Sequence, residues 1–299
     1  MAKPLNCIAL GGSAVAMRFD YYRASFPVGT DADQVIDHLA LHNPDGDLVE
    51  GRPRMGYEKC HTLRDDFGER WADVLHGGSN GVLVETSDDC SPDVVEVIRQ
   101  AWPHHVVTRA DVCQDLVTEE QGLFAKLHPE LQQVVAAHGR VKARTILPDQ
   151  RKQGTSYLIG SRQSETYIRV YQKPEELVAS GKGHRNLSTF FDRWVRIEVE
   201  AKPQKDNRHR AAVFTPEEFW GLSRISRQVC STALSIDVGK TSAIDYRSIT
   251  AKERARRSLG KMFGNTLQTW KEELGSWAEL GLSIRELLEE LDRDKRRHR

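Results

Sequence analysis

Residues 155–173, T-S-Y-L-I-G-S-R-Q-S-E-T-Y-I-R-V-Y-Q-K, are the stretch from which the fold can be worked out. Two runs rich in aromatic and β-branched residues, 157–159 and 167–173, flank polar turn residues at 160–164, a pattern typical of a β-hairpin. Side chains alternate along a strand, so the second run has two different faces. One face is apolar, and the other carries Tyr167, Arg169, Tyr171 and Lys173.

This polar face has two interpretations. Guanidinium groups bind phosphate oxygens, an ammonium group neutralises their charge, and a tyrosine hydroxyl can attack phosphorus and stay covalently attached to the product. Tyr and Arg are also ordinary residues on the solvated face of an edge strand. The hairpin alone does not decide between a phosphate site and a solvent-facing strand.

The composition indicates a globular protein. The chain has 299 residues, a length that is enough for two domains or for one large domain with an appendage. Of these residues, 29% are charged and 39% are hydrophobic, as is typical of globular proteins. We find no apolar run of membrane-spanning length, and the first residues lack the apolar core of a signal peptide. The five cysteines are scattered without the spacing of a disulfide framework or a zinc site. We therefore expect a cytoplasmic protein with reduced thiols and no membrane partner.

Charge is unevenly distributed along the chain. Residues 1–105 contain 9 Lys and Arg against 17 Asp and Glu, a net charge of −8. The whole chain has 43 of each, so residues 106–299 carry +8. A basic second part favours a polyanion as the partner of the later segments.

Two further strands are expected to carry acidic residues on one face. In residues 106–116, V-V-T-R-A-D-V-C-Q-D-L, alternation puts Asp111 and Asp115 on the same face. Four strand residues span roughly 13 Å, so these two carboxylates are not expected to bind the same ion. In residues 194–202, Arg196, Glu198 and Glu200 share a face. Buried acids are costly unless a metal ion or an arginine meets them.

Considered together, the three strands predict a phosphoryl-transfer site. A cluster of carboxylates can hold Mg²⁺ or Mn²⁺, and such an ion polarises a phosphodiester while a nucleophile attacks in line. This hypothesis requires the three polar faces to coincide. If the strands merely face water, their polar faces should point in different directions.

The order of elements predicts the fold class. We expect strands at 18–26, 56–63, 81–86 and 106–116, and helices beginning near residue 31 and spanning 93–101 and 118–138. A short helix follows at 174–181, and the last third is expected to be helical at 215–233, 258–274 and 283–291. The predicted fold is α+β, an antiparallel or mixed β-sheet covered by helices with a helical C-terminal extension.

The same pattern suggests a division into regions. Residues 1–205 would form a catalytic domain, which can also be divided into two related halves, 1–105 and 106–205. Residues 206–299 would form a helical region for DNA binding or dimerisation, with Arg254, Arg256, Arg257 and Lys261 supplying positive charge. A packing appendage with a solvated tail is the alternative for this region.

Several motifs, in this order and spacing, resemble the replication initiation factor family of the Rep_trans type. They are T-R-x-D at 108–111, G-S-R-x-S at 160–164, R-x-Y-x-K at 169–173 and W-V-R-x-E-x-E at 194–200, with F-D-Y at 19–21 and S-D-D-C at 87–90. The last motif lacks the glycine of its relatives. The chain has no His-x-His, so the two-histidine metal motif of other rolling-circle nickases is absent.

The resemblance implies a rolling-circle initiator of plasmids or filamentous phages. Such an enzyme nicks one strand at its origin through a tyrosine, remains joined to the 5′ phosphate and later rejoins the strand. It implies origin DNA, unpaired at the nick site, as the partner, and a homodimer and a host helicase as further partners. The alternative is a non-catalytic, sequence-specific DNA-binding regulator on the same fold.

The resemblance also assigns roles to residues. Tyr171 is the expected nucleophile, with Tyr157 second and Tyr167 third. Arg169 and Lys173 would assist it by holding phosphate or lowering the pKa of the phenol, which is protonated at neutral pH when unperturbed. Expected DNA or phosphate contacts are Ser161, Arg162 and Arg196, and expected ligands of Mg²⁺ or Mn²⁺ are Asp111, Glu198 and Glu200.

Overall fold

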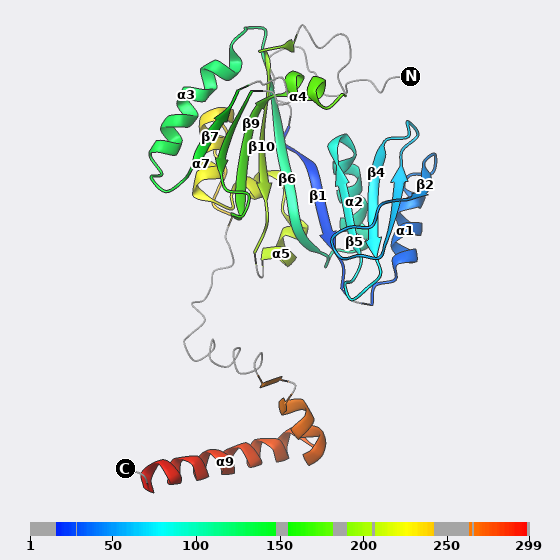
Figure 1. Cartoon of the computed structure of the whole chain (residues 1–299), viewed down its shortest axis with the longest axis vertical. Helices are drawn as coiled ribbons and strands as arrows, with labels where there is room; N and C mark the ends of the chain where they lie inside the picture. The colour runs from blue at the N-terminus through cyan, green and yellow to red at the C-terminus, as the bar shows by residue number, and fades with distance from the viewer. Residues whose placement is uncertain are drawn as a thin grey trace. The chain divides into compact units, whose positions relative to one another are not determined.

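The structure is a computed structural model that describes residues 16–27, 29–147, 155–181, 190–204, 207–241, 263–264 and 266–297 (Figure 1). It divides into two compact units, Met1–Ala243 and Ile244–Arg299. The first unit holds the β-sheet, and the second is helical. The boundary between the units does not coincide with the expected boundary after residue 205, and the functional division stays a prediction.

The first unit is built on one sheet of ten described strands in which every neighbouring pair is antiparallel. The strand order is β2-β3-β4-β5-β1-β6-β10-β9-β8-β7. The bounds are β1 Arg18–Ser25, β2 Asp47–Glu50, β3 Lys59–Arg64, β4 Arg70–His76, β5 Leu83–Ser87, β6 Val106–Val117, β7 Ala143–Ile146, β8 Ser156–Gly160, β9 Thr166–Gln172 and β10 Trp194–Ala201.

This strand order is symmetric about the pair formed by β1 and β6. In each half, the chain begins at the centre, passes through a helix to the outer edge and returns strand by strand. The helix is α1 (Ala32–Leu41) in the first half and α3 (Leu123–Ala136) in the second. Each half then ends in helices, α2 (Ser91–Ala101) in the first, and α5 (Asn207–Arg210), α6 (Pro216–Trp220) and α7 (Arg224–Leu234) in the second.

Local sequence explains several of these elements. Asp31 caps α1 by accepting a hydrogen bond from the backbone N–H of Asp33 at 3.0 Å. Pro92 lies in the first turn of α2, where its missing N–H costs nothing. Gly160 ends β8 with a φ of 90°, a conformation that a residue with a Cβ rarely adopts. The expected hairpin of β8 and β9 is confirmed.

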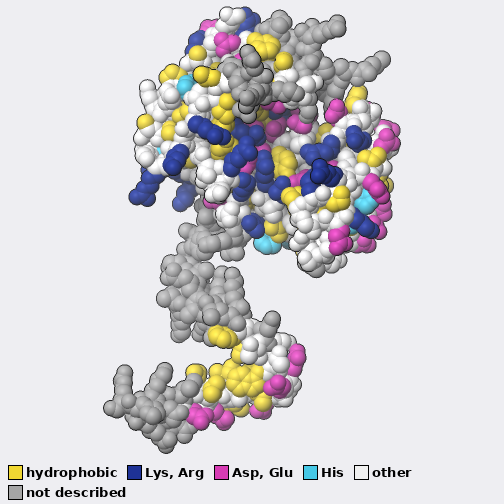
Figure 2. Space-filling view, viewed as in Figure 1, with side chains coloured by type: hydrophobic (Ala, Val, Ile, Leu, Met, Phe, Trp, Pro, Cys, Tyr) yellow, Lys and Arg dark blue, Asp and Glu magenta, His cyan; other side chains and the backbone are white. Residues whose placement is uncertain are grey.

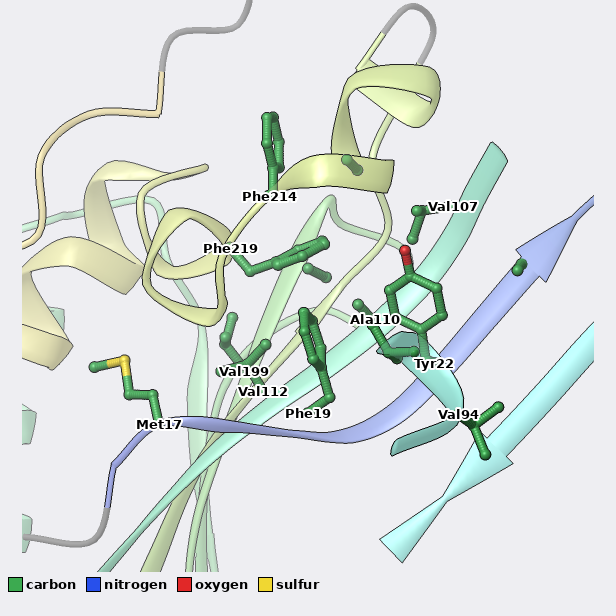
Figure 3. Close-up of a cluster of buried hydrophobic side chains, with 14 of the residues drawn as sticks. Met17, Phe19, Tyr22, Val94, Val107, Ala110, Val112, Val199, Phe214 and Phe219 are labelled. Atoms are coloured by element: carbon green, nitrogen blue, oxygen red, sulfur yellow. The ribbon is translucent and has the colours of Figure 1, made fainter. Parts of the chain in front are cut away.

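The apolar core lies on one face of the sheet, where the helices pack. Figure 3 shows Phe19 and Tyr22 of β1 beside Val112 of β6 and Val199 of β10, with Phe219 of α6 facing them. The rings of Phe19 and Phe219 meet edge to face with centroids 5.7 Å apart. One face of every central strand is therefore occupied by the core, which leaves the other face for polar side chains.

The structure confirms the α+β class and corrects several boundaries. Strands β2, β4 and β7 lie where no strand was predicted, and α3 begins at Leu123 rather than at residue 118. The helix expected over 215–233 is two helices, interrupted at Gly221. A Cβ at Gly221 would lie 2.6 Å from the carbonyl oxygen of Gly239, so the chain that follows α7 crosses too closely for any larger residue.

The second unit contains α9 (Trp277–Arg297), which is longer than the predicted helix over 283–291. Residues 266–274 are helical, and the rest of the helix expected over 258–274 falls largely outside the described residues, as do Arg254, Arg256, Arg257 and Lys261. None of the helices described here has both the length and the apolar character needed to cross a lipid bilayer.

Candidate functional site

The polar faces of the three strands coincide, as the site hypothesis requires. In antiparallel pairs, residues directly opposite one another point to the same face. Glu198 lies opposite Arg169 of β9 and Cys113 of β6, and Glu200 lies opposite Tyr167 and Asp111. Figure 2 shows Lys and Arg side chains gathered over the sheet, with Asp and Glu between them. The sheet thus has an apolar face under the helices and one shared polar face.

Tyr171 lies at the centre of the second half of this face. Its hydroxyl donates a hydrogen bond to Oε2 of Glu198 at 3.2 Å, and its side chain is buried. Arg169 donates to the other oxygen of Glu198. The Nζ atom of Lys173 lies 5.9 Å from the centre of the Tyr171 ring. The tyrosine is therefore in contact with a carboxylate and near two cations.

Two arginines link the three carboxylates that were expected to bind metal. The Nη2 atom of Arg169 contacts Glu198 and lies 3.5 Å from Oδ2 of Asp111. The Nη2 atom of Arg109 lies 2.5 Å from the same Asp111 oxygen and 3.1 Å from Glu200. Asp111, Glu198 and Glu200 are therefore adjacent, and guanidinium groups now stand between them.

A second buried cluster surrounds Arg196. Asp115 accepts hydrogen bonds from Nε and Nη2 of Arg196, both at 2.7 Å, and from the indole N–H of Trp194 at 2.9 Å. Asp20 accepts from Nη1 of Arg196 at 2.8 Å and from Arg18 at 3.2 Å. Asp115 thus has a task separate from that of Asp111, as the distance along the strand predicted.

Asp20 reaches this cluster because of an irregularity in β1. The register between β1 and β6 shifts between Phe19 and Tyr21, so that Asp20 is the extra residue of a β-bulge. Phe19 packs in the core while Asp20 and Tyr21 both contact polar-face residues. Sequence reasoning treated Asp20 only as part of the F-D-Y motif and missed its position beside Arg196. The signal was an acidic residue between two aromatic residues, Phe19 and Tyr21.

Burial and neighbouring charge shift the acidities of this site in different directions. Burial raises the pKa of Glu198 to about 8, although Arg169 opposes the shift. Burial and the adjacent Glu198 raise the pKa of Tyr171 well above its ordinary value. Burial also tends to raise the pKa of Asp115, but Arg196 outweighs it and the pKa is lowered. Glu198 is therefore a stronger base than an ordinary carboxylate, and Tyr171 is a weaker acid than an ordinary phenol.

The remaining predicted residues are placed as follows. Tyr157 was expected to be able to face the site, and this is wrong, because its ring packs edge to face on His128 of α3 in the core. Tyr167 is on the polar face, opposite Glu200. Lys173 was predicted to lie on the same strand as Tyr171, and this is wrong, because β9 ends at Gln172. Lys173 begins α4 (Lys173–Ala179) and binds Glu176 at 2.6 Å.

The three expected phosphate contacts differ in exposure. Ser161 and Arg162 are exposed in the turn between β8 and β9. Arg196 has only 4% of its surface exposed, and carboxylates already bind its guanidinium group. In this arrangement Arg196 organises the acids of the site and does not face solvent.

The donor chemistry at Asp111, Glu198 and Glu200 suits a hard divalent cation, since all three offer carboxylate oxygens. A guanidinium nitrogen of Arg169 stands between Asp111 and Glu198, at a place where positive charge is favoured. Within the described ranges, no three His, Cys, Asp or Glu side chains are already placed around one metal position. Metal binding by these residues would therefore require the arginines to move.

The first half of the sheet carries its own polar cluster on the same face. Glu85 of β5 accepts hydrogen bonds from the Tyr21 hydroxyl, from Arg23 at 2.6 Å and from Arg54. Asp73 of β4 accepts from Arg54 at 2.7 Å and from Arg70 at 3.0 Å. Sequence reasoning did not identify this cluster, because it did not predict β4.

The comparisons with known proteins gave one family match and a structural likeness. A family model described as replication initiation factor matches residues 106–276, more than half of the chain. No curated protein matches the sequence. Among solved structures, the rolling circle replication initiator protein from Geobacillus stearothermophilus is similar at 18% identity and a TM-score of 0.48, covering 76% of this chain and 99% of that chain. The family match includes β6 to β10 and all residues predicted for the site.

Proposed function

The chain belongs to the replication initiation factor family, and from this membership we propose that it initiates rolling-circle DNA replication. It binds its origin, nicks one strand through a tyrosine and later rejoins that strand. The observation that carries this proposal is the hydrogen bond from the Tyr171 hydroxyl to Glu198, on a polar face shared with arginines and further carboxylates.

The chemistry assigned to these residues is a transesterification. The Tyr171 oxygen attacks phosphorus, and its proton passes to Glu198 in its ionised form, whose Oε2 accepts the hydrogen bond of the tyrosine hydroxyl. The bond between phosphorus and the 3′ oxygen breaks, and the 3′ oxygen takes a proton from water and leaves as a hydroxyl. The 5′ phosphate is then joined to Tyr171, and attack by a 3′ hydroxyl on this link reverses the step and closes the strand.

The surrounding charges have supporting roles. Arg169 is 30% exposed, so its guanidinium group can turn from Glu198 to phosphate oxygens. Arg162 and Ser161 lie in the exposed turn next to it and would hold the neighbouring phosphate. Lys173, whose Nζ lies 5.9 Å from the Tyr171 ring centre, would favour the phenolate by its charge.

Mg²⁺ or Mn²⁺ is the proposed cofactor, and Asp111, Glu198 and Glu200 are the residues that would hold it. When bound, such an ion supplies positive charge that polarises the phosphodiester and lowers the pKa of nearby acids. The proposed partner is origin DNA with the nicked strand unpaired, and a homodimer and a host helicase are further proposed partners. The site of action proposed for the protein is the cytoplasm.

One observation favours the alternative of a DNA-binding regulator without catalysis. Burial and Glu198 raise the pKa of Tyr171, which opposes formation of the phenolate that attacks phosphorus. An initiator must reverse this shift when DNA and metal bind. A regulator would never need to.

A nicking assay tests the proposal. Supercoiled DNA carrying the protein's own gene and flanks is incubated with Mg²⁺ or Mn²⁺ and either the native chain or Tyr171→Phe. We expect the native chain to produce open circles with protein attached to the 5′ end. Tyr171→Phe, which removes only the attacking oxygen, should produce neither product.

Two matched variants locate the nucleophile. Tyr167→Phe changes a tyrosine on the same polar face, and Tyr157→Phe changes one in the core. Both should still nick. Cleavage that survives in Tyr171→Phe but is lost in Tyr167→Phe would move the nucleophile to Tyr167. Salt-sensitive DNA binding by the native chain without any cleavage would establish the regulator instead.

A further inference from the structure

A cavity of about 360 Å³ opens beside Tyr171, over the outer strands of the second half of the sheet. Its floor is formed by two rows of paired residues on the polar face. One row runs from Arg144 of β7 through Leu158 of β8 to Arg169, and the other runs from Ile146 through Ser156 to Tyr171. Helix α4 forms a wall with Glu176, Ala179 and Ser180. The cavity is thus lined in part by Tyr171, whereas the carboxylates of Asp111, Glu198 and Glu200 are not among its lining residues.

The lining of this cavity has the chemistry of a nucleotide site. Three arginines, Arg144, Arg162 and Arg169, face it and supply positive charge for phosphate. Leu158 and Ile146 offer an apolar surface on which the flat face of a base can pack. Side chains of Ser156 and Gln172 provide hydrogen-bonding groups for the edge of a base. The volume lies in the range of roughly 300–1,000 Å³ that small-molecule sites occupy.

One polar atom of a lining residue lacks a partner among the described residues. Nε of Arg169 is buried and makes no hydrogen bond within the described part of the chain. A buried donor without an acceptor is costly, so a group that brings an acceptor to this place is favoured. A phosphate oxygen is an acceptor of this kind, and it also carries the charge that the guanidinium group attracts.

We propose that the cavity holds one unstacked nucleotide, one of the two that flank the phosphodiester attacked by Tyr171. This inference rests on the proposed function and adds a subsite to it. Taking a base out of the stack costs free energy, and contacts in a pocket that receives the base compensate for the lost stacking. The nucleotide would position the scissile phosphate against the Tyr171 hydroxyl.

The test fills the cavity without touching the residues assigned to catalysis. Ala179 lines the cavity from α4, and Ala179→Phe places a ring inside it. The matched control is Val178→Phe, which adds a ring to the neighbouring residue of the same helix. Val178 is 54% exposed and does not line the cavity. Thermal unfolding of both variants checks that each one folds.

The readouts are nicking of the mapped strand and fluorescence of 2-aminopurine, placed between purines on either side of the nick. Stacking quenches this base, so its fluorescence rises when it enters the cavity. We expect Ala179→Phe to abolish the rise and to slow nicking by at least about tenfold, whereas Val178→Phe changes either by less than about twofold.

The outcomes separate the two proposals. If the native chain nicks and Ala179→Phe nicks at the native rate with the same fluorescence, the subsite is wrong and the enzyme stands. If both phenylalanine variants lose activity equally while folded, the cavity is not the cause and the subsite is again wrong. If the native chain does not nick any DNA, the proposed function fails and the subsite falls with it.

Discussion

The two halves of the sheet have the same strand arrangement, but they carry different side chains on the shared polar face. Each half places a buried glutamate on the fifth strand of its series, Glu85 in β5 and Glu198 in β10, and each glutamate accepts a hydrogen bond from a tyrosine hydroxyl. Glu198 pairs with Arg169 on the neighbouring strand, and Glu85 pairs with Asp73, so Asp73 is the equivalent of Arg169 in the first half. Two residues further along the same strands, the equivalent of Tyr171 is Leu75.

This difference shows that the strand arrangement alone does not place a tyrosine at the position equivalent to that of Tyr171. Leu75 packs with Cys60 and Leu83 in a small apolar cluster, so the first half has no tyrosine where the second half has its proposed nucleophile. The family match also begins at residue 106, with the first strand of the second half. We infer that the first half serves as support and that the chemistry belongs to the second.

The largest expected effect separates the two glutamates. Glu198→Gln removes the acceptor for the Tyr171 proton and should slow nicking by about 10²- to 10⁴-fold, the usual contribution of a general base. Glu85→Gln should change the rate by less than about threefold, since it lies outside the proposed site. Equal loss in both variants would show that the halves share one site and would break the comparison.

The next effect concerns stability. Asp115→Asn neutralises the carboxylate that accepts two hydrogen bonds from Arg196, which has 4% of its surface exposed, and should cost about 3 kcal/mol because Asp20 is the carboxylate that remains beside this buried charge. Asp73→Asn should cost about 1–2 kcal/mol, because Arg54 and Arg70 are about one-third exposed and can turn to water. Chemical unfolding of both variants measures the difference. Equal costs would mean that the two halves bury their ion pairs alike.

The two glutamates also predict opposite dependence of stability on pH. The pKa of Glu198 is raised to about 8 by burial, so its stabilising contribution is complete below its unfolded pKa near 4.5 and is lost as the pH rises to about 8. The pKa of Glu85 is lowered, because the Tyr21 hydroxyl, Arg23 and Arg54 outweigh burial. Its contribution is present above that unfolded value and is lost as the pH falls.

Unfolding of the native chain and of the two Gln variants across this pH range checks the signs. Glu198→Gln should flatten the decline on the alkaline side, and Glu85→Gln should flatten the decline on the acid side. A tenfold difference in proton affinity between the folded and unfolded states corresponds to about 1.4 kcal/mol of stability. A Glu198→Gln variant with the native decline would contradict the raised pKa.

The smallest expected effect is on the salt dependence of DNA binding. Arg144→Gln combined with Arg162→Gln removes two exposed cations of the second half and should reduce the slope of log K against log salt by about 1.4 for a single strand. Arg52→Gln combined with Arg64→Gln removes two exposed cations of the first half and should leave the slope unchanged. A reduced slope in the second pair would show that DNA also contacts the first half.

The first half was also the harder half to predict. Strand β4, R-W-A-D-V-L-H, is buried along its central five residues, so alternation of polar and apolar residues is weak. Its Asp73 is satisfied by Thr62 and by arginines on other segments, which no local pattern indicates. Strands β2 and β7 are short edge strands with mostly exposed residues, and they resemble loops in sequence.

The regularity of the strands also decided which residues of the candidate site could be predicted. Alternation along β6, β9 and β10 correctly grouped Asp111, Arg169, Tyr171, Glu198 and Glu200, because these strands are regular. Asp20 was missed because a bulge changes the face on which it lies, and Lys173 was misplaced because the strand ends one residue earlier. Tyr157 was misplaced because the partner strand's register decides its face.

By itself, the sequence determined the α+β class, the central hairpin, the family and the set of polar residues on each regular strand, because strand alternation and capping are local properties. Only the tertiary structure decided that three polar faces coincide, that arginines stand between the carboxylates and that a cavity opens beside Tyr171. These features depend on strand order and register across the sheet. Both are set by contacts between segments far apart in the chain.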